Sequence, residues 1–301
     1  MSGLQAANKY SIKDLERLSN IKAHTIRIWE QRYGMLTPKR TETNIRFYSD
    51  DELRKLLNIS LLNRNGYKVS RIAAMQVDEI EQEVQSITAS KSDLDTVIDS
   101  LVFAMLEMKE TAFNNILEEA ISKMGLEEVF LQIVFPFLEK VGNLWVTGSV
   151  RPIQERFASN LVRQKLITYI DALPSEYNQS SKKFLLFTPE NESHEMSLLF
   201  NCYQLKSRKH IVQYLGVNIP LYDLVSFCSS QHPDFLVSCF TIYPTGEALK
   251  NYLEVVSEHF KQSTIILSGY QIRSYKGIFP SNVIRFQGVI DFIKFLDNTL
   301  K

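Results

Sequence analysis

A single histidine stands within a run of acidic side chains, a combination that can bind a transition metal. His194 follows Glu192 by two positions in the segment TPENESHE, residues 188–195. An imidazole binds a metal through one ring nitrogen, while a carboxylate can accept a hydrogen bond from the other nitrogen and fix the tautomer. One protein ligand is too few for structural zinc but sufficient beneath a metal that a macrocycle already holds, which points toward a corrinoid. A histidine that caps or decorates a surface helix is the alternative.

Cations and aromatic side chains are concentrated in residues 23–48, where they could bind nucleic acid. Thr25 and Arg27 stand near the start of a short predicted helix, a position from which side chains reach base edges in the major groove. Residues of the predicted hairpin that follows would contact the DNA backbone or the minor groove. The predicted DNA-binding residues are Thr25, Arg27, Arg32, Tyr33, Arg40, Arg46 and Tyr48.

The charge is divided unevenly along the chain, although its 34 basic and 34 acidic residues sum to zero. Residues 1–75 hold fourteen Lys and Arg against seven Asp and Glu, a net charge of +7. Residues 77–128 hold thirteen acids against three Lys, a net charge of −10. A basic segment gains affinity for phosphates by counterion release, without sequence preference. The charge alone would also fit a solvated basic face on an ordinary helical domain.

The elements that must position these cations are a helix, a turn, a second helix and a small wing. Ser11 and Asp14 form a capping-box-like pair in front of the first helix. The second helix follows Asn20, and Gly34 can end it by taking a positive φ angle. The apolar residues expected between the two helices are Ile12, Leu15, Leu18, Ile21, Ile26 and Trp29.

The wing is expected to be a hairpin whose second strand is half-buried. Ile45 and Phe47 alternate there with Arg46 and Tyr48, which is the pattern of a strand with one apolar face. Ser49 and Glu52 then form another capping box, which predicts a helix that runs to about Gly66.

The middle of the chain predicts a four-helix bundle. The small polar stretch from Ser86 to Ser92 is interpreted as a linker. Pro136 should kink or break the third helix, because proline has no backbone N–H. Helices are expected near residues 93–106, 109–124, 126–146 and 152–173.

The last part of the chain predicts an α/β domain. Short apolar runs alternate there with helical stretches, which favours a doubly wound, parallel, five-stranded sheet of the flavodoxin-like kind. Ligands of such sheets bind beyond the carboxyl ends of the strands, so the loop after the first strand, which contains His194, should be the site. The predicted strands lie in KFLLFT, HIVQYLG, DFLVSCFT, STIILSGY and VIRFQG.

Length and composition favour a soluble, multidomain protein. The 301 residues are 45% hydrophobic, and no stretch of about eighteen apolar residues occurs that could span a membrane. The N-terminal residues lack the apolar core of a signal peptide, so we expect a cytoplasmic protein without membrane partners. Cys202, Cys228 and Cys239 show no metal-ligand spacing and are expected to be thiols.

The N-terminal segment resembles the MerR family of winged helix-turn-helix regulators. Asn44 stands where many relatives have glycine, and asparagine tolerates a left-handed turn better than most residues. The resemblance implies a homodimer that binds a double-stranded DNA operator with two half-sites. It is carried by Thr25-Ile26-Arg27-Ile28-Trp29-Glu30, Arg32-Tyr33-Gly34, Pro38, Arg40, Arg46 and Tyr48.

Residues 90–301 resemble the cobalamin-binding module of methionine synthase and of the CarH group of MerR-type repressors. The lower-ligand motif of that family is an acid, any residue, His, two residues and Gly, and it corresponds here to residues 192–197 with Ser197 in place of glycine. The resemblance implies that His194 binds the cobalt of cobalamin, which is adenosylcobalamin in the light-sensing members. The implied cofactor-binding residues are Trp145, Glu155, Glu192, His194, Ser238, Ser268 and Gly269.

The chain departs from the cobalamin-binding pattern at several positions. The light-sensing regulators have Trp, nine residues and Glu-His, whereas Glu155 is followed here by Arg156. The elements that line the nucleotide tail correspond to Ser238-Cys239-Phe240 and Ser268-Gly269, and both are altered. Larger side chains at Phe240, Ser197 and Ser268 occupy space that smaller residues would leave open, so we expect weaker binding, and Arg156 disfavours a light response.

The sequence therefore predicts a multidomain protein with an all-α winged helix-turn-helix domain at residues 1–78. A four-helix bundle at 90–178 and a Rossmann-like domain at 180–301 follow it. The predicted function is a DNA-binding transcriptional repressor, not an enzyme, whose C-terminal half senses cobalamin. The alternatives are a corrinoid carrier component of a methyltransferase, and a regulator with a degenerate module that a protein partner controls.

Overall fold

The computed structural model describes residues 9–41, 43–90, 94–146, 149–228 and 230–299. The chain divides into two compact units, which meet in sequence between Val162 and Arg163. Across the described ranges, no helix is both long enough and apolar enough to cross a membrane.

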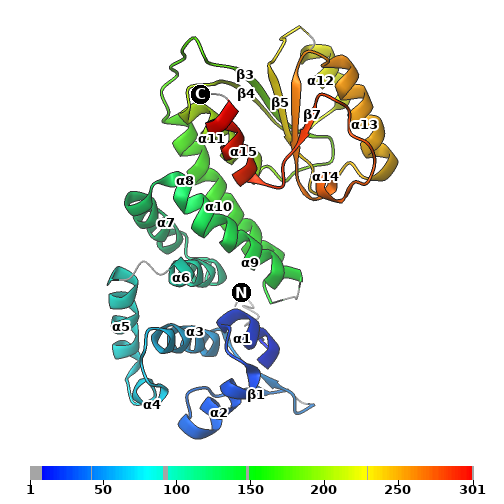
Figure 1. Cartoon of the computed structure of the whole chain (residues 1–301). Coiled ribbons are helices and arrows are strands. Elements are labelled where there is room, and N and C mark those ends of the chain that lie inside the picture. The colour runs from blue at the N-terminus through cyan, green and yellow to red at the C-terminus, as the bar shows by residue number, and fades with distance from the viewer. Residues whose placement is uncertain (1–8, 42, 91–93, 147–148, 229, 300–301) are drawn as a thin grey trace, which may run out of the picture. The chain divides into compact units, whose positions relative to one another are not determined.

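The first unit begins with the predicted helix, turn, helix and wing. Ser11 and Asp14 form a complete capping box, in which each side chain accepts a hydrogen bond from the backbone N–H of the other residue. Gly34 ends the second helix with φ +64°, as predicted. The elements, labelled in Figure 1, are α1 (Ile12–Ser19), α2 (Ala23–Tyr33), β1 (Lys39–Arg40), β2 (Arg46–Phe47), α3 (Asp50–Arg64) and α4 (Val69–Ile72).

The wing differs from its prediction in which side chains are buried. Ile45 is 64% exposed, whereas Tyr48 is completely buried. The backbone of Tyr48 pairs with that of Tyr10, and this pairing brings the Tyr48 side chain into the core. Ile45 lies near the tip of the hairpin, whose strands have two residues each, and is therefore outside the core. Asn44 has φ +62°, so the expectation of a left-handed turn there is confirmed.

The second predicted capping box is only half formed. The Ser49 hydroxyl accepts a hydrogen bond from the backbone N–H of Glu52, as expected. The Glu52 carboxylate instead accepts one from the N–H of Thr37 at 2.8 Å. Glu52 therefore ties α3 to the loop in front of the wing.

The helices of the bundle lie close to the predicted ranges, but the predicted linker is wrong in extent. Residues 86–90 continue a helix, and residues 91–93 lie outside the described residues. Helix-forming residues such as Glu83 and Gln85 precede the polar stretch, so the helix propagates through it. The helices are α5 (Val77–Ser90), α6 (Leu94–Leu106), α7 (Glu110–Met124), α8 (Leu126–Val129), α9 (Phe135–Val146) and α10 (Pro152–Asp171).

Pro136 follows a π-helical segment, η1 (Phe130–Val134), that joins α8 to α9. The N–H of Phe135 donates to the carbonyl of Phe130, one residue farther back than in an α-helix. This wider turn accommodates a residue that has no N–H, so the break predicted at Pro136 is a local change of helix type. The core beside it contains Phe113 and Phe137, whose ring centroids are 5.6 Å apart.

The second unit contains the predicted five-stranded parallel sheet, in the order β4-β3-β5-β6-β7. This order is the flavodoxin-like one, with a switch point between β3 and β5. The strands are β3 (Lys183–Pro189), β4 (Ile211–Ile219), β5 (Phe235–Cys239), β6 (Thr264–Ser268) and β7 (Val283–Arg285).

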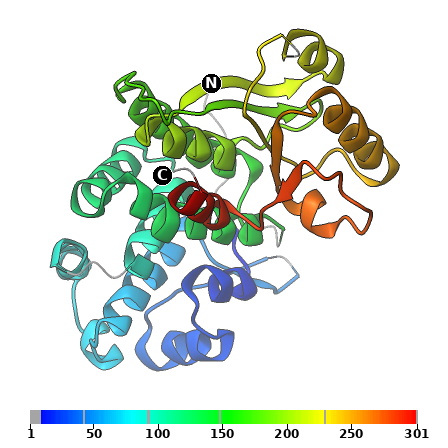
Figure 2. The ribbon, with the colours of Figure 1, turned by 45° about the horizontal axis from the view of Figure 1, so that its top comes forward.

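Helices cover both faces of the sheet, which explains why its central strands are apolar along their whole length. One apolar cluster lies between the sheet and α12, α13 and α14, and the other between the sheet and α11 and α15. Figure 2 shows α11 and α15 side by side on their face. The helices are α11 (Met196–Ser207), α12 (Leu221–Cys228), α13 (Gly246–His259), α14 (Tyr270–Ser274) and α15 (Val289–Thr299).

Candidate functional sites

Helix α2 turns one face to the core and the other to solvent. Ile26 is completely buried and Trp29 is 7% exposed, which confirms the prediction that Trp29 is a packing residue. Arg27 and Arg32 lie on the exposed face, and Thr25 near the start of the helix is half-buried. The helix therefore offers its N-terminal half and two guanidinium groups to a partner, in the manner of a recognition helix.

The wing contacts helix α2 through Glu30, which is not among the predicted DNA-binding residues. The Glu30 carboxylate accepts a hydrogen bond from the Tyr48 hydroxyl at 2.9 Å and lies 3.5 Å from Nε of Arg46. At the tip, Arg40 donates to the side-chain oxygen of Asn44 at 2.7 Å. The two wing arginines are therefore held in fixed positions while their charge remains near the surface.

Tyr48 is corrected from a DNA contact to a positioning residue. It is completely buried, and burial together with the Glu30 carboxylate raises the pKa of its hydroxyl. A protonated, buried hydroxyl cannot reach a duplex, but it can fix Glu30 and, through it, Arg46. Tyr33 lies half-buried, and the Arg32 guanidinium is 5.3 Å from the centre of its ring.

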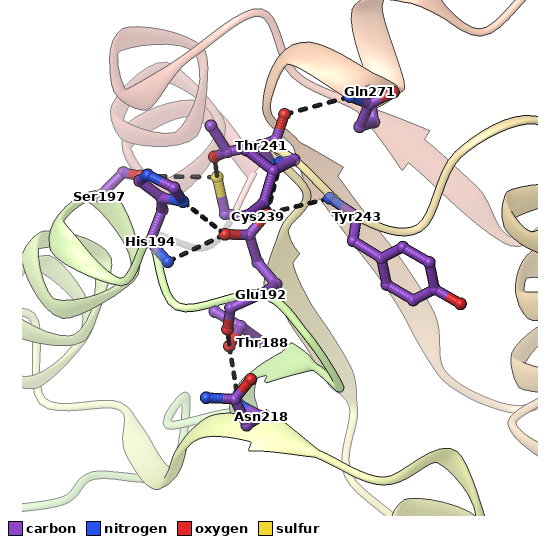
Figure 3. A network of polar contacts seen from close by, with 10 residues as sticks. Thr188, Glu192, His194, Ser197, Asn218, Cys239, Thr241, Tyr243 and Gln271 are labelled. Carbon is purple, nitrogen blue, oxygen red and sulfur yellow. Dashed lines mark hydrogen bonds and ion pairs between the residues drawn. The ribbon is translucent and has the colours of Figure 1, made fainter. Parts of the chain in front are cut away.

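In the second unit, the loop after β3 is organised around Glu192, whose side chain is completely buried (Figure 3). Its carboxylate accepts hydrogen bonds from Nδ1 of His194 at 2.7 Å and from the backbone N–H of the same residue at 2.9 Å. It also accepts from the N–H groups of Thr241 at 2.6 Å and Ile242 at 2.7 Å. Burial alone would raise the pKa of Glu192, but these donors lower it to about 2.

The contact with Glu192 determines which nitrogen of His194 could bind a metal. A carboxylate accepts hydrogen bonds only, so Nδ1 carries a proton, and in the neutral imidazole Nε2 is the nitrogen with the lone pair. The side chain of His194 is 55% exposed, although its carboxylate partner is completely buried. The loop is held from below, since the hydroxyl of Thr188 donates to the carbonyl of Glu192 at 2.6 Å.

Apolar side chains stand at the same edge of the sheet as His194. Ile242 and Tyr243 follow β5 and are 52% and 37% exposed, and Tyr270 follows β6 and is 58% exposed. Parallel strands bring these loops together at their carboxyl ends. Among the described residues, no group of three or more His, Cys, Asp or Glu could hold a bare metal ion. The edge therefore combines one imidazole with an apolar surface, which suits a flat, metal-bearing macrocycle better than a free ion.

Two family models match parts of this chain. Residues 10–77 match the MerR HTH family of regulatory proteins, and residues 97–169 match the B12 binding domain. The chain joins a MerR-type DNA-binding domain to a B12-binding domain.

Two curated relatives are similar to most of this chain. The chain is 29% identical to the HTH-type transcriptional repressor CarH of Myxococcus xanthus, over 77% of this chain and 78% of the relative. It is 25% identical to the repressor CarA of the same organism, over 89% of each. The monomethylamine corrinoid protein of Methanosarcina barkeri has a TM-score of 0.54 at 12% identity and covers 66% of this chain and 96% of its own, which shows a shared fold.

The part of the chain that matches the B12-binding domain includes Trp145 and Glu155. Trp145 is 52% exposed, so it is not a core residue of the bundle. Ile153 is 64% exposed as well. Glu155 is half-buried and accepts a hydrogen bond from the Ser159 hydroxyl at 2.7 Å. The bundle thus exposes two large apolar side chains near Glu155 in the sequence.

Two of the predicted tail-lining residues have structural roles. Ser238 is 1% exposed and its hydroxyl donates to the carbonyl of Phe187 at 2.7 Å, and its predicted contact with a ligand stays a prediction. Gly269 has φ +102°, and a Cβ there would lie 2.3 Å from the carbonyl oxygen of Phe240. The carbonyl of Ser268 accepts a hydrogen bond from the N–H of Phe240 at 2.9 Å. The ends of β5 and β6 are therefore in direct backbone contact.

Phe240 and Ser197, which stand where the family motif has smaller residues, both contact partners within the second unit. Phe240 is completely buried and packs edge-on against Tyr252, with ring centroids 5.5 Å apart. The hydroxyl of Ser197 lies 3.6 Å from Sγ of Cys239. That these side chains leave less space for a nucleotide tail stays a prediction.

Proposed function

We propose that this chain is a transcriptional repressor that binds operator DNA as a homodimer and whose DNA affinity depends on cobalamin held by His194. The observation that supports it most directly is the Glu192–His194 pair at the carboxyl edge of the sheet, on a chain that also carries a winged helix. The proposal makes the chain a regulator rather than an enzyme.

The DNA half of the proposal rests on helix α2 and the wing. Thr25, Arg27 and Arg32 would contact the major groove, with Tyr33 at the end of the same helix. Arg40 and Arg46 would contact phosphates or the minor groove from a wing that Glu30 and Asn44 hold in place. A homodimer would present two such surfaces to two half-sites one helical turn apart.

The cofactor half rests on residues that suit a corrinoid. When bound, cobalamin would supply a cobalt atom that an imidazole nitrogen can ligate. Nε2 of His194 is the candidate ligand, because Glu192 holds the proton on Nδ1. Ile242 and Tyr270 would contact the corrin ring. In the bundle, Trp145 and Glu155 are the residues that the family resemblance assigns to the cofactor. Ser268 and Gly269 would lie along the nucleotide tail.

Ligand control of DNA binding requires different affinities in two states. A cofactor favours the arrangement of the chain to which it binds more tightly. If protomers associate differently in that arrangement, the spacing of the two α2 helices changes, and with it the affinity for an operator. Arg156 stands where the light-sensing relatives are expected to have histidine, so we expect equal binding in darkness and light.

A corrinoid carrier is the alternative from another class, since the same fold serves a corrinoid protein of the methylamine system. The winged helix and its net charge of +7 over residues 1–75 favour the regulator. A regulator that responds to a protein antagonist instead of cobalamin would keep the DNA site and show no cofactor spectrum.

Absorption spectroscopy with the His194→Ala variant tests the proposal. Wild-type protein mixed with adenosylcobalamin or methylcobalamin should give a coloured complex whose visible spectrum changes on His ligation, and the variant should lose that change. In a gel-shift assay, cobalamin should alter operator retention by wild-type protein and leave the variant unaffected. A wild-type protein that stays colourless and ignores cobalamin on DNA would exclude the cofactor half, whereas failure to retain any operator would exclude the DNA half.

A further inference from the structure

Glu195, the residue after His194, stands at the N-cap of helix α11 but does not cap it. A polar side chain at an N-cap normally accepts a hydrogen bond from one of the first N–H groups of the helix. Glu195 makes no such bond, and its side chain is only 13% exposed. One carboxylate oxygen accepts from Nε of Arg163 at 2.5 Å, and the other accepts from the hydroxyl of Tyr214. The carboxylate is therefore committed to two other elements.

Tyr214, which contacts Glu195, lies next to an irregularity in strand β4. Leu186 of β3 pairs with Tyr214 and the next residue, Phe187, pairs with Gly216, so one extra residue is inserted after Tyr214. Gly216 has φ +91°, which favours glycine. Bulges of this kind redirect side chains and occur often beside functional sites. Burial and the Glu195 carboxylate raise the pKa of Tyr214, so its hydroxyl stays protonated and donates.

Arg163 brings helix α10 to the same carboxylate. Ile170, seven residues later and therefore on the same helical face, packs against the apolar cluster beneath α11. The C-terminal part of α10, which belongs to the second unit, is thus attached to the sheet by one ion pair and one apolar contact. The N-terminal part of the same helix carries Glu155.

We propose that Glu195 is a positioning residue for His194, and that its contacts with Tyr214 and Arg163 couple the histidine to helix α10. This inference rests on the proposed function in one respect, namely that His194 is the cobalt ligand. Glu192 fixes the imidazole ring, and Glu195 fixes the backbone on the other side of His194 by anchoring the start of α11.

Loss of the Glu195 anchor should loosen His194 without removing its partner Glu192. The Nδ1-protonated tautomer depends on the geometry of that contact, so its population should fall when the backbone is released. Partners that orient a metal ligand typically change metal affinity by about 10- to 100-fold. We therefore expect Glu195→Gln and Tyr214→Phe each to weaken cobalamin binding by about tenfold or more.

The test uses the full chain with two readouts. Hydroxocobalamin titration followed by visible absorption gives the affinity and the spectral signature of cobalt–imidazole ligation. Nitrogen-15 NMR of the cofactor-free protein at one fixed pH gives the tautomer of His194. Glu190→Gln is the matched control, because Glu190 is an exposed glutamate of the same loop. A double variant, Glu195→Gln with Tyr214→Phe, should lose little more cobalamin affinity than either single variant, because both substitutions remove the same anchor.

The outcomes separate this inference from the proposed function. If wild-type protein leaves the cobalamin spectrum unchanged, cobalt ligation by His194 has failed, and the nitrogen-15 shifts alone decide whether Glu195 positions the ring. If Glu195→Gln and Tyr214→Phe keep both the wild-type affinity and the wild-type His194 shifts, the positioning role is overturned. Tyr214→Phe, which removes only a hydroxyl, keeps the test valid if Glu195→Gln folds poorly.

Discussion

At the scale of single residues, a carboxylate holds a neighbouring side chain in place in each of the two candidate sites. Glu30 holds Tyr48 and Arg46 behind the DNA-facing surface, and Glu192 holds His194 at the sheet edge. Neither carboxylate faces outward, since Glu192 is completely buried and the side chain of Glu30 is 13% exposed. With a pKa of about 2, Glu192 stays charged at every pH above about 3, so its contact with His194 persists through the physiological range.

The arginine on the exposed face of α2 gives the residue-scale prediction. We expect Arg27→Ala to weaken operator binding by about tenfold or more, because a guanidinium that contacts base edges contributes about 1–3 kcal/mol of discrimination. Lys13 is an exposed residue of helix α1. Lys13→Ala removes the same charge and should weaken operator binding much less. Quantitative gel shifts at one salt concentration measure the operator affinity of both variants. Equal losses of affinity would show that Arg27 contributes only its charge.

At the scale of elements, local signals predicted most of the fold. The capping box at Ser11, the glycine at the end of α2 and the five apolar runs each act within a few residues, so the helices and strands they specify appear where predicted. His194 and Glu192 are likewise two residues apart, and their pairing follows from that spacing.

The features that the sequence did not reveal depend on residues far apart in the chain. The donors that complete the Glu192 site are backbone N–H groups 49 and 50 residues later, which no side-chain pattern marks. Tyr48 is buried because its backbone pairs with Tyr10, not because of its place in an alternating strand. The extra residue that follows Tyr214 in β4 becomes visible only once β4 is paired with β3.

The contact between the ends of β5 and β6 gives the element-scale prediction. Gly269→Ala should destabilise the protein by at least about 2 kcal/mol, because φ is +102° and the added Cβ would meet the Phe240 carbonyl oxygen at 2.3 Å. Gly288→Ala is the control, since a Cβ there meets no atom within 4 Å, and it should change stability by less than about 0.5 kcal/mol. Denaturant unfolding of the two variants checks the difference, and similar midpoints would mean that the backbone can shift at Gly269.

At the scale of the whole molecule, charge is separated along the sequence. A segment with a net charge of +7 carries the winged helix, and the next segment carries −10. The acidic segment includes exposed Glu110, Glu118 and Glu128 on the bundle helices. Because the two charges lie on one chain, the acidic segment reduces the attraction between the whole protein and a polyanion. Such a balance lowers the electrostatic part of the DNA affinity for all sequences alike, so the preference for an operator depends on specific contacts.

Replacing Glu110, Glu118 and Glu128 together with glutamine tests this balance. The triple variant should bind random-sequence DNA about threefold more tightly than wild type at low salt, because three repulsive charges are removed. The difference should disappear near 0.5 M salt, where the screening length is only a few ångströms. Affinity for a cognate operator should rise by the same factor, so that the ratio of specific to non-specific binding stays constant. Fluorescence anisotropy across a salt series measures the affinity for random DNA, its salt dependence and the affinity for the operator. An affinity for random DNA that is unchanged at low salt would show that the acidic segment does not act on the duplex, and the charge separation would then need another explanation.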